Sequence, residues 1–299
     1  MSLVIDKLTK KYGSTLAVDA ISFQAQPGQV LGFLGPNGAG KSTTMKVATG
    51  YLRADAGQVT VMGKPVEAEG MATKALIGYL PEHNPLYLDM YVPEYLAFSG
   101  KTYGVGGALL PKRVAEAIDR TGLQAERHKK IGALSKGYRQ RVGLAQTLVH
   151  NPPVLILDEP TTGLDPNQIL EIRALIRQIG AEKTVVLSTH IMQEVEAVCN
   201  RYVIINKGKI AAEGDVGQQG NPTFSLEVDK PLDLDALLAL EGIASARMAG
   251  KYTYALTFTD ERTGRAALLR HCADNNIDLR SLTRQAQSLE EIFRQATGA

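Results

Sequence analysis

Apolar and polar positions in the first part of the chain follow a strand pattern and then a helix pattern. Residues 20–26 alternate between apolar and polar side chains, and residues 30–34 form a short apolar run that ends at a glycine-rich loop. Alternation predicts a half-buried strand, and a short apolar run between turn residues predicts a buried one. A helix is expected over residues 42–50, where Gly50 ends the pattern, and a further strand over residues 58–62.

The middle of the chain is helical, and strands alternate with helices after it. Residues 92–150 include a segment that opens at Pro111 with one apolar face, and a later helix for which Ser135 is a suitable N-cap. Residues 154–157, Val-Leu-Ile-Leu, suit a strand buried on both faces of a parallel sheet. Helix, strand, helix and strand are then expected over residues 169–179, 184–188, 191–199 and 202–206. This alternation predicts a doubly wound α/β core.

A change in composition divides the chain into two parts. Residues around 214–222 are rich in glycine and glutamine, which is typical of a linker, and we place the linker at residues 216–222. The expected domains are therefore residues 1–215 and residues 223–299. In the second domain the pattern predicts strand, helix, strand, strand, helix and strand, followed by a last helix. The first six elements have the β-α-β-β-α-β order of a small α+β, ferredoxin-like fold.

The composition is that of an ordinary folded protein and argues against several classes. Hydrophobic residues make up 44% and charged residues 21% of the 299 residues, with a formal net charge of +2. Because no strong basic bias is present, no nucleic-acid partner is expected. Two cysteines, far apart and without a metal-binding spacing, favour unpaired thiols in a reducing compartment. No secretory signal or membrane span is recognised, so work at a membrane would need another polypeptide to do the spanning.

The strongest chemical signal is a glycine-rich loop between a predicted strand and a predicted helix. Residues 35–42 fit the phosphate-binding pattern G-x-x-x-x-G-K-[ST] in the context that this motif requires. Backbone N–H groups of such a loop surround the β-phosphate of ATP, Lys41 reaches the β- and γ-phosphates, and the Ser42 hydroxyl binds Mg²⁺. The alternative is a glycine-rich turn that happens to precede Lys-Ser. The expected ATP-binding residues of the loop are Gly35, Pro36, Asn37, Gly38, Ala39, Gly40, Lys41, Ser42 and Thr43.

A second signal places two carboxylates at the end of a buried strand. The apolar run at residues 154–157 is followed directly by Asp158 and Glu159. Asp158 is expected to hold Mg²⁺, through water, and Glu159 to polarise the attacking water as general base. The alternative is an acidic strand end that caps the following helix.

A third motif suits anion binding at the start of a helix. In residues 134–138, Leu-Ser-Lys-Gly-Tyr, the Ser135 hydroxyl, the Gly137 N–H and the helix N-terminus together can grip a phosphate. By itself, this motif is equally compatible with an ordinary N-capped helix. Upstream of the Asp-Glu strand end it resembles the signature, usually Leu-Ser-Gly-Gly-Gln, of ATP-binding cassette (ABC) ATPase subunits. The resemblance covers about residues 1–215. It implies a P-loop NTPase (RecA-like) core with an antiparallel β subdomain and a helical subdomain at residues 92–150.

The resemblance also implies roles for further residues. Tyr12 falls where the family stacks an aromatic ring on adenine, although alone it reads equally as a surface or core tyrosine. Asp165 lies in a loop that crosses the dimer interface, and His190 resembles the switch residue that contacts the γ-phosphate and orients Glu159. In this family the signature residues act in trans, on the ATP held by the partner subunit. The expected signature set is Ser135, Lys136, Gly137 and Tyr138.

Several departures from the family pattern indicate which members of the family this chain resembles. Glu82 stands where the family usually has glutamine, and its carboxylate can still approach Mg²⁺. Lys136 and Tyr138 replace glycine and glutamine of the signature. Together with residues 288–293, Ser-Leu-Glu-Glu-Ile-Phe, these variants resemble the ATPases of ABC-2 type exporters, of the gliding-motility-associated and drug-export kinds.

The resemblance therefore implies an ATPase subunit that works as a head-to-tail dimer of two copies. ATP and Mg²⁺ are the expected cofactors. The expected partner is a separate ABC-2 type membrane permease, which places the subunit in the cytoplasm on the inner face of the cell membrane. Docking is expected near residues 82–98, where Leu86, Tyr87, Leu88, Met90 and Tyr91 supply apolar contacts or simply pack the helical subdomain.

Two other readings stay open. One is a soluble cassette protein of the translation or DNA-repair type, although such proteins usually carry two cassettes or a long coiled coil. In the other reading, residues 223–299 form a ligand-sensing or dimerising module that gates the ATPase.

Overall fold

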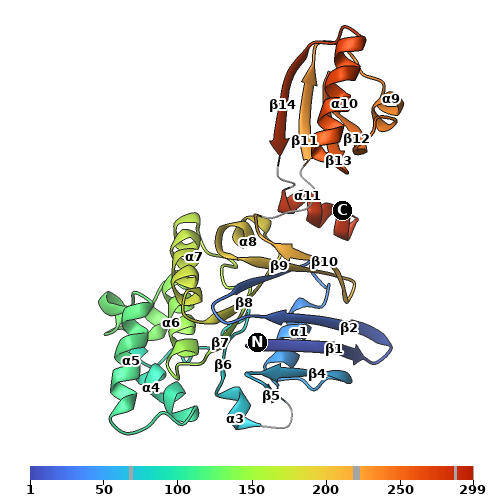
Figure 1. Cartoon of the computed structure of the whole chain (residues 1–299). Helices are drawn as coiled ribbons and strands as arrows, with labels where there is room; N and C mark the ends of the chain where they lie inside the picture. Colours follow the sequence, from blue (N-terminus) through green and yellow to red (C-terminus); the bar gives the residue numbers. More distant parts are fainter. Residues whose placement is uncertain (67–69, 218–222, 286–287, 299) are drawn as a thin grey trace. The chain divides into compact units, whose positions relative to one another are not determined.

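A computed structural model describes residues 1–66, 70–217, 223–285 and 288–298 of the chain (Figure 1). The chain forms two compact units, Met1–Val216 together with Phe293–Ala299, and Gly217–Ile292. Most of the predicted linker, residues 218–222, lies outside the described residues. The first of the two compact units is unit 1, and the second is unit 2.

A six-stranded sheet forms the centre of unit 1. Its order is β10-β9-β3-β8-β7-β6, and only β10 runs antiparallel to its neighbour. The strands are β3 (Val30–Leu34), β6 (Ile77–Leu80), β7 (Val154–Asp158), β8 (Thr184–Thr189), β9 (Arg201–Asn206) and β10 (Lys209–Asp215). Every residue of β3, β7 and β8 is buried, as their apolar runs predict. The sequence pattern did not reveal β10, whose residues are all exposed or half-buried.

Helices of unit 1 flank this sheet, and α1, α7 and α8 follow the parallel strands β3, β7 and β8. They are α1 (Lys41–Ala48), α3 (Met71–Lys74), α7 (Pro166–Gly180) and α8 (Met192–Val198). Helix α7 begins three residues earlier than expected because the Asp165 side chain caps it and Pro166 occupies its first position. Loops that follow β3, β7 and β8 therefore meet at one edge of the sheet, the usual place for ligands in open α/β folds.

A second, antiparallel sheet packs into the same core. Its order is β2-β1-β4-β5, with β1 (Leu3–Tyr12), β2 (Thr15–Ala25), β4 (Ala56–Val61) and β5 (Lys64–Pro65). The inward side chains of β1 and β2 join one apolar cluster with β3. Phe23 and Phe33 stack there with ring centroids 5.0 Å apart. This sheet holds the strand β3, and hence the glycine-rich loop after it, from one side.

The helical subdomain has its own apolar core. It consists of α4 (Val92–Thr102), α5 (Leu109–Arg120), the short turns η1 (Gln124–Glu126) and η2 (Ile131–Ala133), and α6 (Lys136–Leu148). Pro111 lies in the first turn of α5 and does not open it. Ser135 is the N-cap of α6, as the sequence predicts.

Unit 2 is a four-stranded antiparallel sheet with order β12-β13-β11-β14. Its elements are β11 (Thr223–Val228), α9 (Leu234–Leu238), β12 (Ile243–Gly250), β13 (Thr253–Phe258), α10 (Glu261–Asp274) and β14 (Leu279–Gln285). This succession is that of the split βαβ arrangement. A last helix, α11 (Leu289–Thr297), ends in unit 1, where the Asn206 amide donates to the Ala296 carbonyl at 3.3 Å. No helix within the described residues is long and apolar enough to cross a membrane.

Candidate functional site

The glycine-rich loop folds over the end of β3 and opens a cleft of about 480 Å³. Two of its glycines are required by close backbone approach: a Cβ at Gly35 would lie 2.5 Å from the Ile205 carbonyl oxygen, and one at Gly40 2.6 Å from the Ala17 carbonyl oxygen. Gly40 also has φ +109°, a conformation that other residues rarely adopt. The cleft is lined by Ala17, Asn37, Gly38, Gly40, Lys41, Ser42, Thr43, Glu82, Glu159, Thr162 and His190. Residues predicted from three separate motifs thus line one cavity.

Lys41 places its ammonium group where the loop and the end of β7 meet. Its Nζ donates to the Gly35 carbonyl at 2.7 Å and to the Pro36 carbonyl at 3.3 Å. The same nitrogen lies 3.6 Å from Glu159 Oε1, and the side chain is only 6% exposed. A buried cation held in this way supplies positive charge to one end of the cleft, which suits an anionic ligand.

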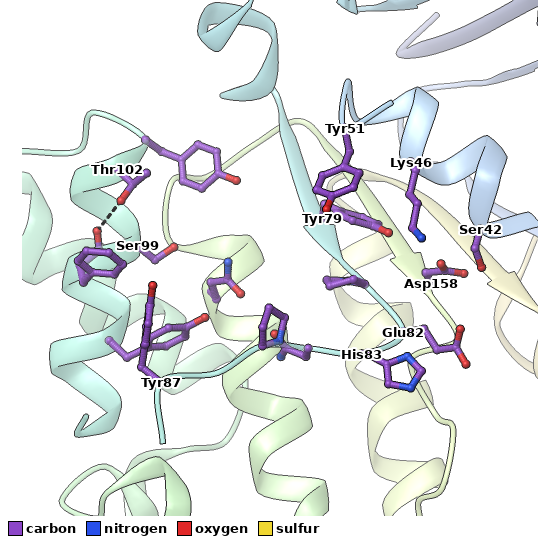
Figure 2. Close-up of a pocket in the computed structure, with 17 residues that line it drawn as sticks. Ser42, Lys46, Tyr51, Tyr79, Glu82, His83, Tyr87, Ser99, Thr102 and Asp158 are labelled. Atoms are coloured by element: carbon purple, nitrogen blue, oxygen red, sulfur yellow. Dashed lines mark hydrogen bonds between the residues drawn. The ribbon is translucent and has the colours of Figure 1, made fainter. Parts of the chain in front are cut away.

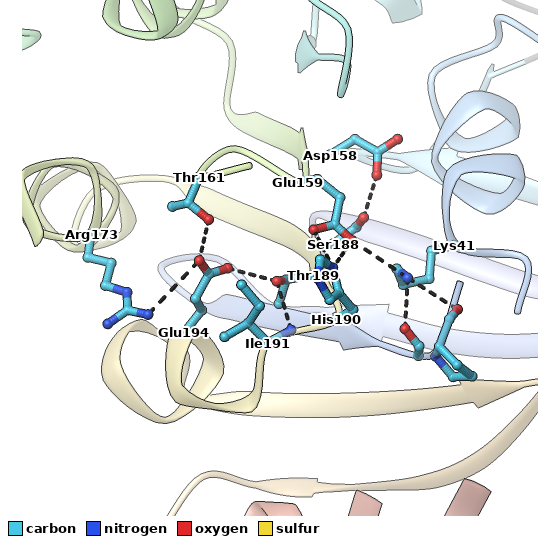
Figure 3. A network of polar contacts seen from close by, with 12 residues as sticks. Lys41, Asp158, Glu159, Thr161, Arg173, Ser188, Thr189, His190, Ile191 and Glu194 are labelled. Carbon is cyan, nitrogen blue, oxygen red and sulfur yellow. Dashed lines mark hydrogen bonds and ion pairs between the residues drawn. The ribbon is translucent and has the colours of Figure 1, made fainter. Parts of the chain in front are cut away.

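Glu159 is held in a strained backbone conformation that aims its carboxylate at His190. Its φ is +50°, and its N–H donates to the Ser188 carbonyl at 2.9 Å. The two carboxylate oxygens lie 3.0 and 2.9 Å from His190 Nδ1 (Figure 3). Left-handed conformations of residues other than glycine cluster at functional sites. A nearly buried carboxylate beside a half-exposed imidazole has the geometry of a general base with an orienting partner.

Asp158 lies beside Ser42 in an adjoining cleft of about 530 Å³ (Figure 2). Asp158 is 1% exposed and accepts a short hydrogen bond from the Ser188 hydroxyl. A hydroxyl and a carboxylate oxygen are donors that Mg²⁺ accepts, with substrate phosphates and water completing its shell. Among the described residues no group of three or more His, Cys, Asp or Glu side chains forms a metal site on its own. Glu82 lines both clefts and is exposed, so it lies within reach of the same region.

The far wall of this adjoining cleft is aromatic. Tyr87 packs edge-on against Tyr95 and Phe98, with centroids 6.0 and 5.6 Å apart. Burial raises the pKa of Tyr95 to about 12, and it also raises the pKa of Tyr79, so both stay protonated and neutral. The aromatic lining residues are Tyr51, Tyr79, Tyr87, Tyr95, Phe98 and Tyr103.

The five residues expected at the docking groove do not lie together. Tyr87 lines the aromatic cleft, whereas Leu86 and Leu88 line a smaller cavity beside Lys136. Met90 packs against the core of the helical subdomain, and Tyr91 is the exposed N-cap of α4. Of the five, only Tyr87 faces the aromatic cleft that also contains Ser42 and Asp158.

The signature residues lie at the start of α6 and do not line the 480 Å³ cleft. Ser135 Oγ accepts from the Tyr138 N–H at 3.4 Å, and Gly137 packs so closely on Gln168 that a Cβ would lie 2.6 Å from that side chain. Lys136 lines a different cavity, with Arg139 and Glu82. Within one chain, these residues are therefore not brought to the glycine-rich loop.

Two further predicted residues lie outside that cleft. Tyr12 is 49% exposed, with Lys10 Nζ 5.9 Å from its ring centroid. Asp165 is exposed and accepts from the Gln168 N–H at 2.9 Å as the N-cap of α7.

Three features of the site were missed in the sequence. Ala17 and Thr162 line the main cleft, and Ser188 fixes both Asp158 and the Glu159 backbone. Thr162 was accessible in principle, because it follows Glu159 by three residues. Ala17 and the contacts of Ser188 were not, because only the folded sheet brings Ala17 to the cleft and Ser188 beside Asp158.

A family model described as ABC transporter matches residues 18–162. The uncharacterized ABC transporter ATP-binding protein YxlF of Bacillus subtilis is 33% identical over 97% of this chain and 98% of its own length. The Nod factor export ATP-binding protein I of Paraburkholderia xenovorans is 33% identical over 99% of this chain and 97% of its own length.

A solved structure resembles the cassette at the level of the fold. It is CbiO1 from Clostridium perfringens, described as part of the ABC transporter complex CbiONQ. The similarity has a TM-score of 0.65 and 30% identity, and it covers 71% of this chain and 88% of that one.

Proposed function

This chain belongs to the family of ABC transporter ATP-binding subunits, and from that premise we propose that it drives export through a separate membrane permease of the ABC-2 type. As a member of the family it binds and hydrolyses ATP. One relative that matches nearly the whole chain is named for export, the Nod factor export ATP-binding protein I. The alternative of a soluble translation or DNA-repair ATPase is not favoured by these relatives.

The proposed roles of individual residues in ATP hydrolysis depend on one observation. Lys41, Glu159 and His190 come from three separate loops and meet in one cleft. A cation for phosphate, a carboxylate for a water proton and an imidazole to orient them are the groups that ATP hydrolysis requires. Positioned together, they support roles as phosphate clamp, general base and switch residue, respectively.

The remaining loop residues are proposed to hold the nucleotide. Backbone N–H groups of residues 35–43 surround the β-phosphate, and Tyr12 stacks on adenine from its exposed position. Ser42 and Asp158 are proposed to hold Mg²⁺, which neutralises the phosphate charge that develops during transfer. Glu82 is proposed to approach the same ion from the loop after β6.

Two copies are proposed to share each ATP. Family members dimerise, and here Lys136 at the start of α6 lines an adjoining cavity with Glu82, Glu159 and Thr162 that includes none of the residues 35–43 of its own chain. Ser135, Lys136, Gly137 and Tyr138 of one copy are proposed to grip the γ-phosphate bound to the other, with Asp165 at the interface. ATP binding then closes the dimer, and hydrolysis opens it.

The permease is proposed to dock at the aromatic cleft, whose lining includes both Ser42 and Tyr87. Docking there would transmit dimer closure to the membrane protein, and it would hold the subunit at the cytoplasmic face of the cell membrane. Tyr87→Ala should then abolish co-purification of a multi-span protein from detergent-solubilised membranes, whereas Leu269→Ala, an exposed apolar change in unit 2, should not. Co-purification of ribosomes or DNA instead would support the soluble alternative.

The catalytic assignment is tested with Glu159→Gln. We expect unchanged ATP affinity, an ATPase rate lowered by roughly 100-fold or more, because a general base contributes about that much, and an ATP-bound dimer in size-exclusion chromatography. Lys41→Ala should remove nucleotide affinity in calorimetry. Matched controls on the surface are Glu182→Gln and Lys112→Ala, whose side chains are largely exposed. Near-normal hydrolysis by Glu159→Gln would remove it from the base role.

A further inference from the structure

A buried glutamate outside the main cleft connects the two loops that carry Glu159 and His190. Glu194, on α8, is 1% exposed. One of its carboxylate oxygens accepts a short hydrogen bond from the Thr161 hydroxyl, and the other accepts from the Thr189 hydroxyl at 2.7 Å (Figure 3). Thr161 is two residues after Glu159, and Thr189 directly precedes His190. We refer to Glu194, Thr161 and Thr189 as the Glu194 clasp.

The geometry argues against a role limited to capping α8. A glutamate at the third helical position usually accepts from the N-cap backbone N–H. Here the N-cap is Ile191, and its N–H donates instead to Thr189 Oγ1 at 3.1 Å. The Glu194 carboxylate therefore accepts hydrogen bonds from the two threonine hydroxyls instead. Its buried charge faces only one cationic group nearby among the described residues, Arg173 of α7, at 4.0 Å.

A buried carboxylate is costly unless it is fully compensated, and packing alone would be served as well by an apolar side chain. The clasp has an additional consequence, because its partners belong to the loops that hold the proposed base and its orienting imidazole. Each loop is fixed at one point by Glu159 and His190 themselves, 2.9 Å apart. The clasp supplies a second point of attachment, and two points fix both the separation and the rotation of the loops.

We propose that Glu194 is a positioning residue for ATP hydrolysis: by binding Thr161 and Thr189 at once, it holds the Glu159 carboxylate and the His190 imidazole in register. This inference rests on the proposed role of Glu159. Glu194 touches neither substrate nor reacting atoms, since it does not line the cleft. Its loss therefore changes the geometry of the base and leaves the groups that bind ATP in place.

The test uses the full-length chain and three variants of the clasp. Thr189→Val also removes the acceptor of the Ile191 N–H, whereas Thr161→Val leaves that hydrogen bond in place. Glu194→Gln keeps the shape but replaces one acceptor oxygen with a donor, and Thr161→Val and Thr189→Val each remove one hydroxyl at nearly constant volume. ATP hydrolysis is followed by phosphate release, and ATP affinity by calorimetry. We expect kcat to fall roughly 10- to 100-fold in Glu194→Gln, because a displacement of about 1 Å at a reacting group costs about that much. ATP affinity should change less than about twofold, since the loop of residues 35–43 is untouched.

Combining the variants distinguishes a positioning role of Glu194 from a role in stability alone. Adding Glu194→Gln to the Thr161→Val, Thr189→Val double variant should lower kcat little further, because the three groups act as a unit. Thr121→Val is the matched control: Thr121 is also fully buried, and its hydroxyl donates to the Ala117 carbonyl at 2.8 Å, far along the chain from both loops. It should lower thermal stability and leave kcat unchanged at a temperature where every variant is folded.

Two results would overturn the proposal. The first is a normal kcat in both threonine variants at that temperature, which also decides the matter if Glu194→Gln does not fold. The second is a parallel loss of kcat in Thr121→Val. Glu159→Gln is assayed alongside: if it retains activity, the base assignment itself fails, whereas its loss together with normal clasp variants rejects only the role of Glu194.

Discussion

Replacing His150 with phenylalanine should remove much of the acid sensitivity of unit 1. His150 follows α6, and its ring stacks on Tyr103 with centroids 3.9 Å apart. Its Nε2 lies 3.1 Å from the Ile77 carbonyl oxygen of β6, while Nδ1 is buried with no partner in the part of the chain that the structure describes. Burial lowers the pKa of His150 from 6.5 to about 4; the Lys183 charge acts in the same direction, and the Ile77 hydrogen bond opposes both.

The direction and size of this change in stability with pH follow from the linkage between protonation of His150 and folding. Above pH 6.5 the imidazole is neutral in both states, and its contribution to stability is complete. As the pH falls toward 4, the unfolded chain binds a proton that the folded chain refuses, and stability is lost. With pKa values of 6.5 and about 4, the loss between pH 7 and pH 5 is about 2 kcal/mol. For a unit of this size that corresponds to roughly 4–8 °C in Tm.

Differential scanning calorimetry at pH 7 and pH 5 measures this directly. The transition of unit 1 is identified as the one that ATP shifts upward. His150→Phe keeps the stack on Tyr103 but loses the hydrogen bond to Ile77, so it should be about 1 kcal/mol less stable than wild type at pH 7. Its Tm should then fall by several degrees less than the wild-type Tm between pH 7 and pH 5. Equal falls in the two proteins would refute the assignment, and so would a His150 ring that titrates near 6.5 by NMR.

Three further outcomes are expected. Gly35→Ala should lose most nucleotide affinity in calorimetry while staying folded by circular dichroism, because its Cβ would lie 2.5 Å from the Ile205 carbonyl oxygen; unchanged affinity would contradict the close approach. Tyr12→Ala should weaken ATP binding roughly fivefold, about 1 kcal/mol for a lost stack on adenine, and equal binding would exclude that role. Burial raises the pKa of the Cys199 and Cys272 thiols, so neither should react rapidly with a thiol reagent at pH 8 until urea is added; fast labelling of the native chain would show that they are accessible.

The parts of the site that sequence reasoning located are those whose geometry is local. In the glycine-rich loop the chemistry depends on residues within about ten positions, since backbone N–H groups and the start of α1 do the work. The position of Asp158 and Glu159 could be predicted equally well, because an apolar run buried on both faces must end at a sheet edge. The same locality explains why Ser135 was recognised as the N-cap of α6.

Contacts between distant segments could not be read in the same way. Glu194 lies 33 residues from Thr161, and nothing in the periodicity of a seven-residue helix distinguishes it from a solvated glutamate. The different surroundings of the residues expected at the docking groove could not be predicted either. Leu86, Leu88 and Met90 are apolar neighbours of Tyr87 in sequence, but they do not line the aromatic cleft. Leu86 and Leu88 line the smaller cavity, and Met90 packs on the core of the helical subdomain.

The proposed division of labour explains why a single subunit would be a poor ATPase even with its base in place. Lys41, Glu159 and His190 surround the cleft from one chain, whereas Gly137 packs closely on Gln168 of its own α7. The Gln168 N–H also donates to the Asp165 carboxylate, which caps α7. Gln168 therefore contacts both the start of α6 and the loop of Asp165, which is proposed to lie at the dimer interface. In the proposed dimer a partner's ATP would therefore meet a preformed surface, and the ordering cost of binding would be low. If so, loosening Gly137 from Gln168 with Gln168→Ala should raise the ATP concentration needed for dimerisation without altering ATP affinity of the monomer; equal dimerisation curves would show that the surface is not preformed.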